Sequence, residues 1–395
     1  MSRYMQLRTS LDALQANPAK TLARELAQVL TGDCLAVMRQ MMEDGVQVDA
    51  VVTDPPAGIS FMGKEWDHHK GGRDQWIAWM QEAAALALQL SKPGAHALVW
   101  ALPRTSHWTA TAWEDAGWEV RDRVAHLFGT GFPKSRDISK AIDAEAGAER
   151  EVVSIERSCF TVRPENAVSW KSGSGGGDSR PRDESGYRYD VVTVPATDAA
   201  RQWEGWGTAL KPACEDWWLL RKPLQGIVAG NVLEHGTGAL NIDGCRVSTG
   251  RWPANVIHSG LSEEWAQYFY CAKAGRSERW KHVVCSCLAQ VIPPGHVVYD
   301  LKHCPLCGDE FKVTAHPTQK PESLMRFLCR LITPPDGTIL DPFCGSGSTG
   351  RGAVLEGFDF VGIEQDPAHA DVARLRIQAA LDKRLGSLGR VSHER

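Results

Sequence analysis

Long apolar runs, excess positive charge and an even set of cysteines are all missing from this 395-residue chain. No run approaches about eighteen apolar residues, so we expect no transmembrane helix and no membrane partner. The first residues, MSRYMQLRTS, lack the apolar stretch of a signal peptide, so the expected location is the cytoplasm. A net charge of −4 excludes a globally basic nucleic-acid binder, and any surface for nucleic acid has to be a local patch.

Two classes of phosphate-binding site also fit the sequence poorly. The chain has no GxxxxGK[ST] motif, which argues against a P-loop NTPase. The loop GSGSTG, residues 345–350, has glycines at close spacing, but an acid precedes it at Asp341. An acid there suits a ligand with an amino group better than a pyrophosphate, so a dinucleotide fold is disfavoured and S-adenosylmethionine, with its zwitterionic amino-acid end, is favoured.

Apolar strands alternate with helices in two separate blocks. In the first block we expect helices at 32–45, 73–91 and 105–117, and strands at 48–54, 95–101 and 118–128. In the second block we expect strands at 338–343 and 358–364 and helices at 347–357 and 366–385. Such alternation predicts an α/β fold, with one parallel sheet assembled from both blocks.

The material between the blocks breaks this rhythm. Residues 144–205 include GSGGGDSRPRDESG, whose glycine, serine and charge predict a mobile loop. The section up to about residue 280 is rich in tryptophan and shows little periodicity. Residues 11–30 are expected to be helical, with a break near Pro18.

The late glycine loop follows a strand and opens a helix. The strand ends at Asp341, and the chain enters the helix through Gly345, Ser346 and Gly347. Glycines allow close approach of a ligand to the backbone and leave helix N-terminal N–H groups available. Glu364 ends the next strand about twenty residues later, where an acid accepts hydrogen bonds from both ribose hydroxyls of a nucleoside. Together these features predict a nucleoside-containing cofactor.

The segment Asp54-Pro55-Pro56-Ala57 ends an early strand with an acid and two rigid residues. Proline fixes φ and has no N–H donor of its own. The Asp54 carboxylate and the Pro55 carbonyl therefore form a rigid pair of acceptors that suits an exocyclic NH2 group. Catalysis would rest on positioning that nitrogen against a methyl sulfonium.

With these two motifs the chain resembles the β group of DNA amino-methyltransferases, whose signatures are DPPY-like and FxGxG. Here they read Asp54-Pro55-Pro56-Ala57 and Phe343-Cys344-Gly345-Ser346-Gly347, with the catalytic motif first. HPTQKP at 316–321 is similar to a family segment beside the cofactor, and GDCLAVM at 32–38 is similar to the segment before the catalytic strand. Two further stretches, 206–224 and 250–257, resemble phage and prophage members.

The resemblance implies a Rossmann-like, S-adenosylmethionine-dependent methyltransferase fold with circularly permuted motif order and an inserted target-recognition region. The cysteine pairs described below add a small zinc ribbon. The parts of the chain would be an N-terminal helical segment at 1–30, a catalytic half at 31–145, a target-recognition insertion at 146–280, the ribbon at 281–312, a cofactor half at 313–385 and a tail at 386–395. The partner would be double-stranded DNA, and monomer or homodimer is left open. The implied cofactor-binding residues are Asp33, His316, Thr318, Lys320, Asp341, Phe343, Gly345, Ser346, Gly347 and Glu364.

Ala57 departs from the family, which carries an aromatic residue there that stacks on the flipped base. Stacking is worth about 1–3 kcal/mol per base. Three alternatives are open. Phe61 or Trp66 supplies the ring, with Lys64 on the same loop over the pocket; the pocket holds the base differently; or the enzyme is weak or inactive.

The target base follows from the residue before Pro-Pro. Asp54 resembles adenine-N6 enzymes, whereas serine is more usual in cytosine-N4 enzymes. Cytosine-C5 transfer needs a thiol nucleophile, and no cysteine follows the prolines, so it is a remote alternative. The leading hypothesis is adenine-N6 methylation, the first alternative is cytosine-N4 methylation, and another is a DNA-binding homologue without catalysis.

Two cysteine pairs suggest a structural metal. Cys285-x-Cys287 and Cys304-x-x-Cys307 are separated by a short connection. Four thiolates in two pairs match a closed zinc site, with His282, His296 and His303 as alternates for the first pair.

DNA contacts are expected from the insertion. The candidate cations are Lys211, Arg221, Lys222, Arg246 and Arg251, and the candidate wedges are Trp203, Trp206 and Trp252. The loop 172–188 would become ordered on DNA.

Overall fold

The computed structural model describes residues 27–60, 65–128, 135–157, 189–246, 250–259, 281–285, 288–292, 312–315 and 319–391. These residues separate into two compact units. Unit 1 comprises the chain up to Ile59, residues 66–129 and everything from Cys214 onward. Unit 2 comprises residues 60–65 and 130–213.

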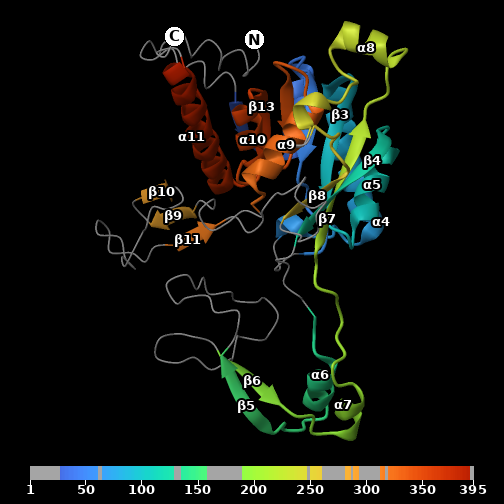
Figure 1. Cartoon of the computed structure of the whole chain (residues 1–395), viewed down its shortest axis with the longest axis vertical. Coiled ribbons are helices and arrows are strands. Elements are labelled where there is room, and N and C mark those ends of the chain that lie inside the picture. Colours follow the sequence, from blue (N-terminus) through green and yellow to red (C-terminus); the bar gives the residue numbers. More distant parts are fainter. Residues whose placement is uncertain are drawn as a thin grey trace. The chain divides into compact units, whose positions relative to one another are not determined.

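An eight-stranded sheet forms the centre of unit 1 (Figure 1). Seven strands run in one direction, and β7 alone is antiparallel to its neighbours β3 and β4. In spatial order the strands are β1 (Ala27–Thr31), β13 (Asp359–Glu364), β12 (Thr338–Asp341), β2 (Val48–Thr53), β3 (Ser91–Ala101), β7 (Cys214–Arg221), β4 (Glu119–Phe128) and β8 (Val256–Ser259). Both sequence blocks contribute to it, so the prediction of one shared α/β sheet is confirmed. The sheet is mixed rather than parallel, because β7 runs antiparallel to both of its neighbours.

Helices cover both faces of this sheet (Figure 1). Against one face pack α3 (Cys34–Glu43), α4 (Arg73–Leu90) and α5 (Ser106–Asp115), and against the other α9 (Glu322–Ile332), α10 (Ser348–Glu356) and α11 (Pro367–Val391). Each face of the sheet has its own hydrophobic core, and consecutive strand residues point into opposite cores. Val51 and Leu340 pack in the core under α3, α4 and α5, and Val52 and Ile339 pack in the core under α9, α10 and α11. This explains why β2 is buried at all six positions and its sequence is continuously apolar around one acid.

Smaller elements complete unit 1. They are α8 (Val228–His235), η5 (Asp243–Cys245) and a three-stranded antiparallel sheet of β9 (Lys281–Cys285), β10 (Leu288–Ile292) and β11 (Lys312–Ala315). The short η3 (Glu65–Asp67) begins at the last residue of the first segment of unit 2 and continues into unit 1. Within the described part of the chain, no helix is both long enough and apolar enough to cross a membrane.

Unit 2 contains α6 (Ile138–Glu145), the antiparallel pair β5 (Val152–Arg157) and β6 (Tyr189–Thr193), and α7 (Asp198–Gln202). The buried carboxylate of Asp143 joins them. It accepts hydrogen bonds from the Thr197 hydroxyl and backbone and from the backbone N–H of Ala196, and it pairs with Arg150 at 2.6 Å. These bonds outweigh the effect of desolvation and lower the pKa of Asp143 to about 2. One carboxylate therefore holds the unit's helices and ribbon together.

Three predicted boundaries differ from the structure. Residues 27–31, expected at the end of a helix, form β1, because parallel pairing with β13 overrides the local helical tendency. Residues 386–391, expected in a polar tail, continue the backbone of α11. Within the expected loop 144–205, the described residues form β5, β6 and α7.

The insertion is shorter than 146–280. Residues 214–221 form β7, which pairs with a strand on each side, and residues 256–259 form β8 at the edge of the main sheet. The sequence CEDWWLLR shows little strand periodicity of its own. It forms a strand because it pairs with β3 and β4, which lie far from it in the sequence. Residues 130–213 belong instead to unit 2.

Candidate active site

A crevice is expected where the sheet changes its winding direction, between β12 and β2. From β12 the chain passes through α10 to β13 on one side, and from β2 it passes through α4 to β3 on the other. Ligands of open α/β sheets bind at the carboxyl ends of strands at such a switch point. The two strand ends are tied together there, since the Thr53 hydroxyl donates to Asp341 Oδ1 at 2.7 Å.

The glycine loop after β12 has the tight form that the sequence predicts. Gly345 and Gly347 have φ values of 53° and 77°, which glycine adopts readily. A Cβ on Gly347 would lie 3.0 Å from the Cα and Cβ of Ala373 in α11. The backbone therefore passes close to α11 and opens α10 without a side chain in the way.

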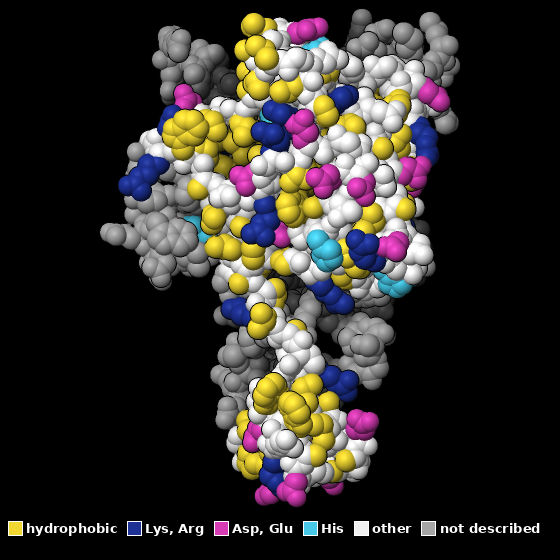
Figure 2. Space-filling model, turned by 90° about the vertical axis from the view of Figure 1, so that its right-hand side faces the viewer, with side chains coloured by type: hydrophobic (Ala, Val, Ile, Leu, Met, Phe, Trp, Pro, Cys, Tyr) yellow, Lys and Arg dark blue, Asp and Glu magenta, His cyan; other side chains and the backbone are white. Residues whose placement is uncertain are grey.

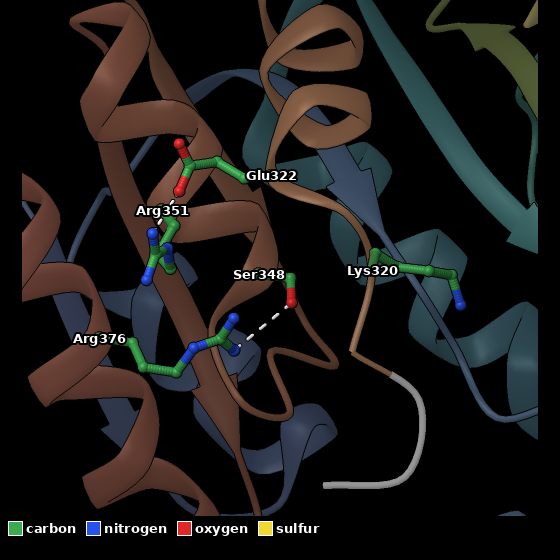
Figure 3. Close-up of a pocket in the computed structure, with 5 residues that line it drawn as sticks. All are labelled: Lys320, Glu322, Ser348, Arg351 and Arg376. Carbon is green, nitrogen blue, oxygen red and sulfur yellow. Dashed lines mark hydrogen bonds and ion pairs between the residues drawn. The ribbon is translucent and has the colours of Figure 1, made fainter. Parts of the chain in front are cut away.

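Arg376 of α11 holds this loop from behind. Its guanidinium is buried and donates to the carbonyl and, at 2.7 Å, to the hydroxyl of Ser346. Figure 3 shows a small pocket beside the loop, lined by Lys320, Glu322, Ser348, Arg351 and Arg376. Arg351 and Glu322 form an ion pair across it.

Glu364 lies at the end of β13, next to the same loop. Its two carboxylate oxygens accept backbone N–H groups of Gly345 and Asp366, each at 2.8 Å. Burial raises the pKa of Glu364, although these two bonds oppose the rise. The acid predicted to contact a ribose is thus fixed in place against the glycine loop.

Asp341 is almost completely buried below the loop. Its Oδ1 accepts the Thr53 hydroxyl and the Phe343 N–H, and the Thr349 hydroxyl is a further partner. Burial raises its pKa to about 6, against these hydrogen bonds and with a contribution from the negative charge of Asp54. These contacts give Asp341 a part in shaping the loop, and its direct contact with a ligand stays a prediction.

The turn after β2 is fixed by side chains from elsewhere in unit 1. The Thr105 hydroxyl donates to the Ala57 carbonyl at 2.9 Å, and Asp67 accepts the Gly58 N–H at 2.8 Å. Among the described residues, no hydrogen bond reaches the carbonyl of Pro55. Its role as an acceptor for an amino group stays a prediction.

Asp54 forms an ion pair that joins the two sequence blocks. Lys320 Nζ donates to Asp54 Oδ2 at 2.7 Å, and the lysine side chain is 9% exposed. Burial raises the pKa of Asp54, while the Lys320 ammonium opposes that rise. The ammonium of Lys320 thus contacts Asp54 in this structure, and its predicted contact with the cofactor stays a prediction.

Several predicted residues lie outside the described part of the chain. They are Phe61, Lys64, His316, Thr318, Cys287, Cys304 and Cys307, and the side chain of Cys285 at the end of β9 is likewise not described. Trp66 is described and is 37% exposed. Asp33 is the N-cap of α3, where its side chain accepts the Ala36 N–H. The ring that replaces an aromatic at Ala57 therefore stays a prediction.

The predicted DNA-contacting cations have partners within the protein. Arg221 pairs with Glu119 at 2.6 Å, and Lys222 donates to the carbonyls of Leu88 and Ser91. Arg221 ends β7 and Lys222 follows it, so both side chains support the sheet, and their contact with DNA stays a prediction. Arg246 pairs with Asp243 and lies over the ring of Trp252.

The sequence interpretation missed Thr53, Thr105 and Trp100. Trp100 lies near the carboxyl end of β3, the strand beside β2, and its ring faces the Lys320 ammonium at 4.1 Å. Its position at that strand end was the available signal, because neighbouring parallel strands present their carboxyl ends at one edge.

The residues around the glycine loop fit S-adenosylmethionine. The close passage of Gly347 leaves the loop without a projecting side chain, and Glu364 offers carboxylate oxygens beside it. Phe343 contributes an apolar ring that packs against Trp79, with 5.8 Å between ring centroids. A nucleoside with a zwitterionic tail matches this combination of backbone, acid and aromatic surface.

Short segments of the chain are similar to known methyltransferases. A 70-residue segment is 41% identical to the type II methyltransferase M.HinfI of Haemophilus influenzae, covering 18% of this chain and 20% of that protein. An 87-residue segment is 36% identical to the DNA adenine methyltransferase YhdJ of Escherichia coli K12, covering 22% and 29%. The matched segments thus span less than a third of either relative.

Solved structures with a similar outline include the complex of M1.HpyAVI with S-adenosylmethionine, at 14% identity and a TM-score of 0.41, covering 89% of this chain and 98% of that one. PvuII DNA methyltransferase, described as cytosine-N4-specific, has 14% identity and a TM-score of 0.45, with 91% and 93% covered.

The family comparison covers most of the chain. Residues 48–375 match the model of the N6/N4 DNA methylases. That range includes the Asp54 turn, unit 2, Lys320 and the glycine loop with Glu364. This chain belongs to the N6/N4 family of DNA methylases.

Proposed function

We propose that this protein transfers a methyl group from S-adenosylmethionine to the exocyclic amino group of a base in double-stranded DNA, with adenine N6 as the target. The observation that carries the proposal is the juxtaposition of two strand ends at the switch point, joined by the hydrogen bond from Thr53 to Asp341. One end bears the Asp54 carboxylate and the Pro55 carbonyl, and the other bears the glycine loop.

The protein's part in the reaction is positioning. Asp54 Oδ1 and the Pro55 carbonyl accept the two amino hydrogens, which leaves the nitrogen lone pair directed at the methyl donor. S-adenosylmethionine supplies a methyl group on a positively charged sulfur, and it is consumed as a substrate. The nitrogen forms the new N–C bond, the electrons of the C–S bond stay on sulfur, and the surplus proton leaves the nitrogen for a base, for which the Asp54 carboxylate is in position.

Adenine is favoured over cytosine by two observations. Asp54 resembles the adenine enzymes at the position before Pro-Pro, and one relative, YhdJ, is a DNA adenine methyltransferase. Cytosine N4 is the second candidate, since the same two acceptors suit its amino group. Cytosine C5 is disfavoured, because the Cys344 thiol is buried and burial raises its pKa well above the ordinary value.

Unit 2 is proposed to recognise the target sequence. It exposes Trp203 and Trp206, whose rings meet edge to face, and the loop 172–188 belongs to its sequence. Figure 2 shows lysine and arginine side chains interspersed with acidic ones on the face in view. DNA contacts from Lys211, Arg246 and Arg251 stay part of this proposal.

A structural zinc ion is proposed on Cys285, Cys287, Cys304 and Cys307. The proposal is supported by the sequence spacing and by the position of Cys285 as the last residue of β9, paired with Leu288 of β10. Purified folded protein is expected to contain one zinc per chain by mass spectrometry of the metal. Zinc-free protein with an unchanged melting transition would refute the site.

The activity is tested with unmethylated plasmid and genomic DNA. Each is incubated with isotopically labelled S-adenosylmethionine, and the digested nucleosides are identified by mass spectrometry. Wild-type protein should yield labelled N6-methyladenine, and Asp54→Ala should lower the rate by about 10²–10³-fold or more while still binding S-adenosylhomocysteine. Labelled N4-methylcytosine would move the target to the second candidate. Undiminished transfer by Asp54→Ala would contradict the mechanism.

A further inference from the structure

Lys320 connects the segment before α9 with the end of β2, across 266 positions of sequence. Its ammonium lies 2.7 Å from Asp54 Oδ2, and both side chains are largely shielded from solvent, with 9% and 20% exposed. Charge-assisted hydrogen bonds in such surroundings are stronger than those on the surface. The pair is therefore a partly buried, hydrogen-bonded ion pair rather than an exposed one on the surface.

Trp100 limits where the ammonium can go. Lys320 Nζ lies 4.1 Å from the centroid of its ring, within the range of a cation–π contact. The indole N–H of Trp100 donates in turn to Glu215 Oε2 at 3.2 Å, which fixes the ring. Figure 3 shows Lys320 pointing away from Arg351 and Arg376, which line the same pocket beside the glycine loop.

We propose that Lys320 is a positioning residue for Asp54. Held by Trp100, its ammonium binds one oxygen of the Asp54 carboxylate and leaves the other directed at the amino group of the base. On this assignment Lys320 does not bind the cofactor. The inference rests on the proposed methyl transfer, and it adds a residue that sets the charge and orientation of the catalytic acid.

The charged groups around Asp54 explain why such a residue is needed. Burial raises the pKa of Asp54, and the negative charges of Glu215 and Asp67 add to that rise. Asp341, which accepts the Thr53 hydroxyl, is a further acid whose charge interacts with that of Asp54. Lys320 is the cation among the described groups that opposes them. A protonated Asp54 would offer a hydroxyl at one oxygen and would be a poorer acceptor for the amino group.

The test compares Lys320→Met, which keeps the stem and removes the charge, with Lys320→Arg, which keeps the charge. Activity requires ionised Asp54, so it falls as pH drops through the pKa of that carboxyl. Without Lys320 this acid limb should move to higher pH, and the rate at pH 7 should fall by about tenfold or more. The methionine variant should recover at alkaline pH, and the arginine variant should keep the wild-type limb with part of the rate.

Lys222→Met is the matched control. Lys222 is also partly buried, but it donates to the carbonyls of Leu88 and Ser91 beside the start of β3. Its loss should lower the melting temperature without moving the acid limb. Lys320→Met should also bind S-adenosylhomocysteine within about threefold of wild type by calorimetry.

Two results would overturn the inference. If Lys320→Met lowers the rate equally at every pH, the lysine has only a structural role. If the variant no longer binds S-adenosylhomocysteine, Lys320 is a cofactor-binding residue. If wild type methylates no DNA, the proposed function fails, but the inference is still tested by unfolding. The stability deficit of Lys320→Met should then grow as pH rises and Asp54 ionises, and a deficit that is independent of pH would refute it.

Discussion

The two strand ends at the switch point are built in different ways. The end of β12 is ordered largely by its own neighbours in sequence and by the helices that follow, since Glu364 binds the Gly345 N–H and Arg376 binds Ser346. The end of β2 is ordered by remote side chains, since Thr105 binds the Ala57 carbonyl and Lys320 binds Asp54. Apart from the Thr53–Asp341 bond, the glycine loop is thus held by side chains of the second sequence block, whereas the Asp54 turn is held by side chains of both blocks.

The largest effect that separates the two ends is expected from Gly347→Ala. At φ 77° and 3.0 Å from Ala373, an added Cβ forces the loop to move. The affinity for S-adenosylhomocysteine should fall by about tenfold or more, as measured by calorimetry.

Gly45→Ala is the control for that variant. Gly45 has φ 72°, but nothing lies within 4 Å of its added Cβ. It should cost about the same backbone strain in stability without weakening binding. Equal binding losses in both variants would show that general destabilisation, not the loop, is responsible.

A smaller effect is expected at the other end from Thr105→Val. The change removes the hydrogen bond to the Ala57 carbonyl, at a cost of about 1 kcal/mol in the free energy of unfolding. The turnover number should fall several-fold while the affinity for S-adenosylhomocysteine stays at the wild-type value. Thr109→Val, a buried change on the same helix, should leave turnover unchanged. A matching drop in cofactor affinity would mean that the two ends are not independent.

An effect on the pH dependence of stability is expected from Asp341→Asn, which lies between the two ends. The folded pKa of Asp341 is about 6, above the value of about 4 for an unfolded aspartate. Its contribution is therefore fully present below pH 4 and is lost as pH rises through 6, by about 1–3 kcal/mol. The variant should lack this component in denaturant unfolding measured from pH 4 to 8. An unchanged pH dependence would mean that Asp341 is ionised at little cost.

The difference between local and long-range contacts also explains which parts of the fold and the site could be predicted from the sequence. The glycine loop, Glu364 and the Asp54 turn are local patterns, and the strands and helices that present them lie where the periodicity indicates. The Lys320–Asp54 pair could not be found this way, because its partners meet only after the sheet has formed. Strand β7 was missed for a related reason: it is stabilised by β3 and β4 on either side, not by a strong pattern of its own.

The antiparallel course of β7 has a consequence for how this chain can be altered. Leu127 of β4 and Cys214 of β7 are register partners, so residues 129–213 leave and return at the same point of the sheet. In effect they are the connection of a hairpin, extended into a unit of its own. The entropic cost of closing a loop rises only slowly with its length, so the length of that connection has little effect on the stability of the sheet. The connection between β4 and β7 can therefore be replaced by another one of different length while the main sheet and its strand ends are kept.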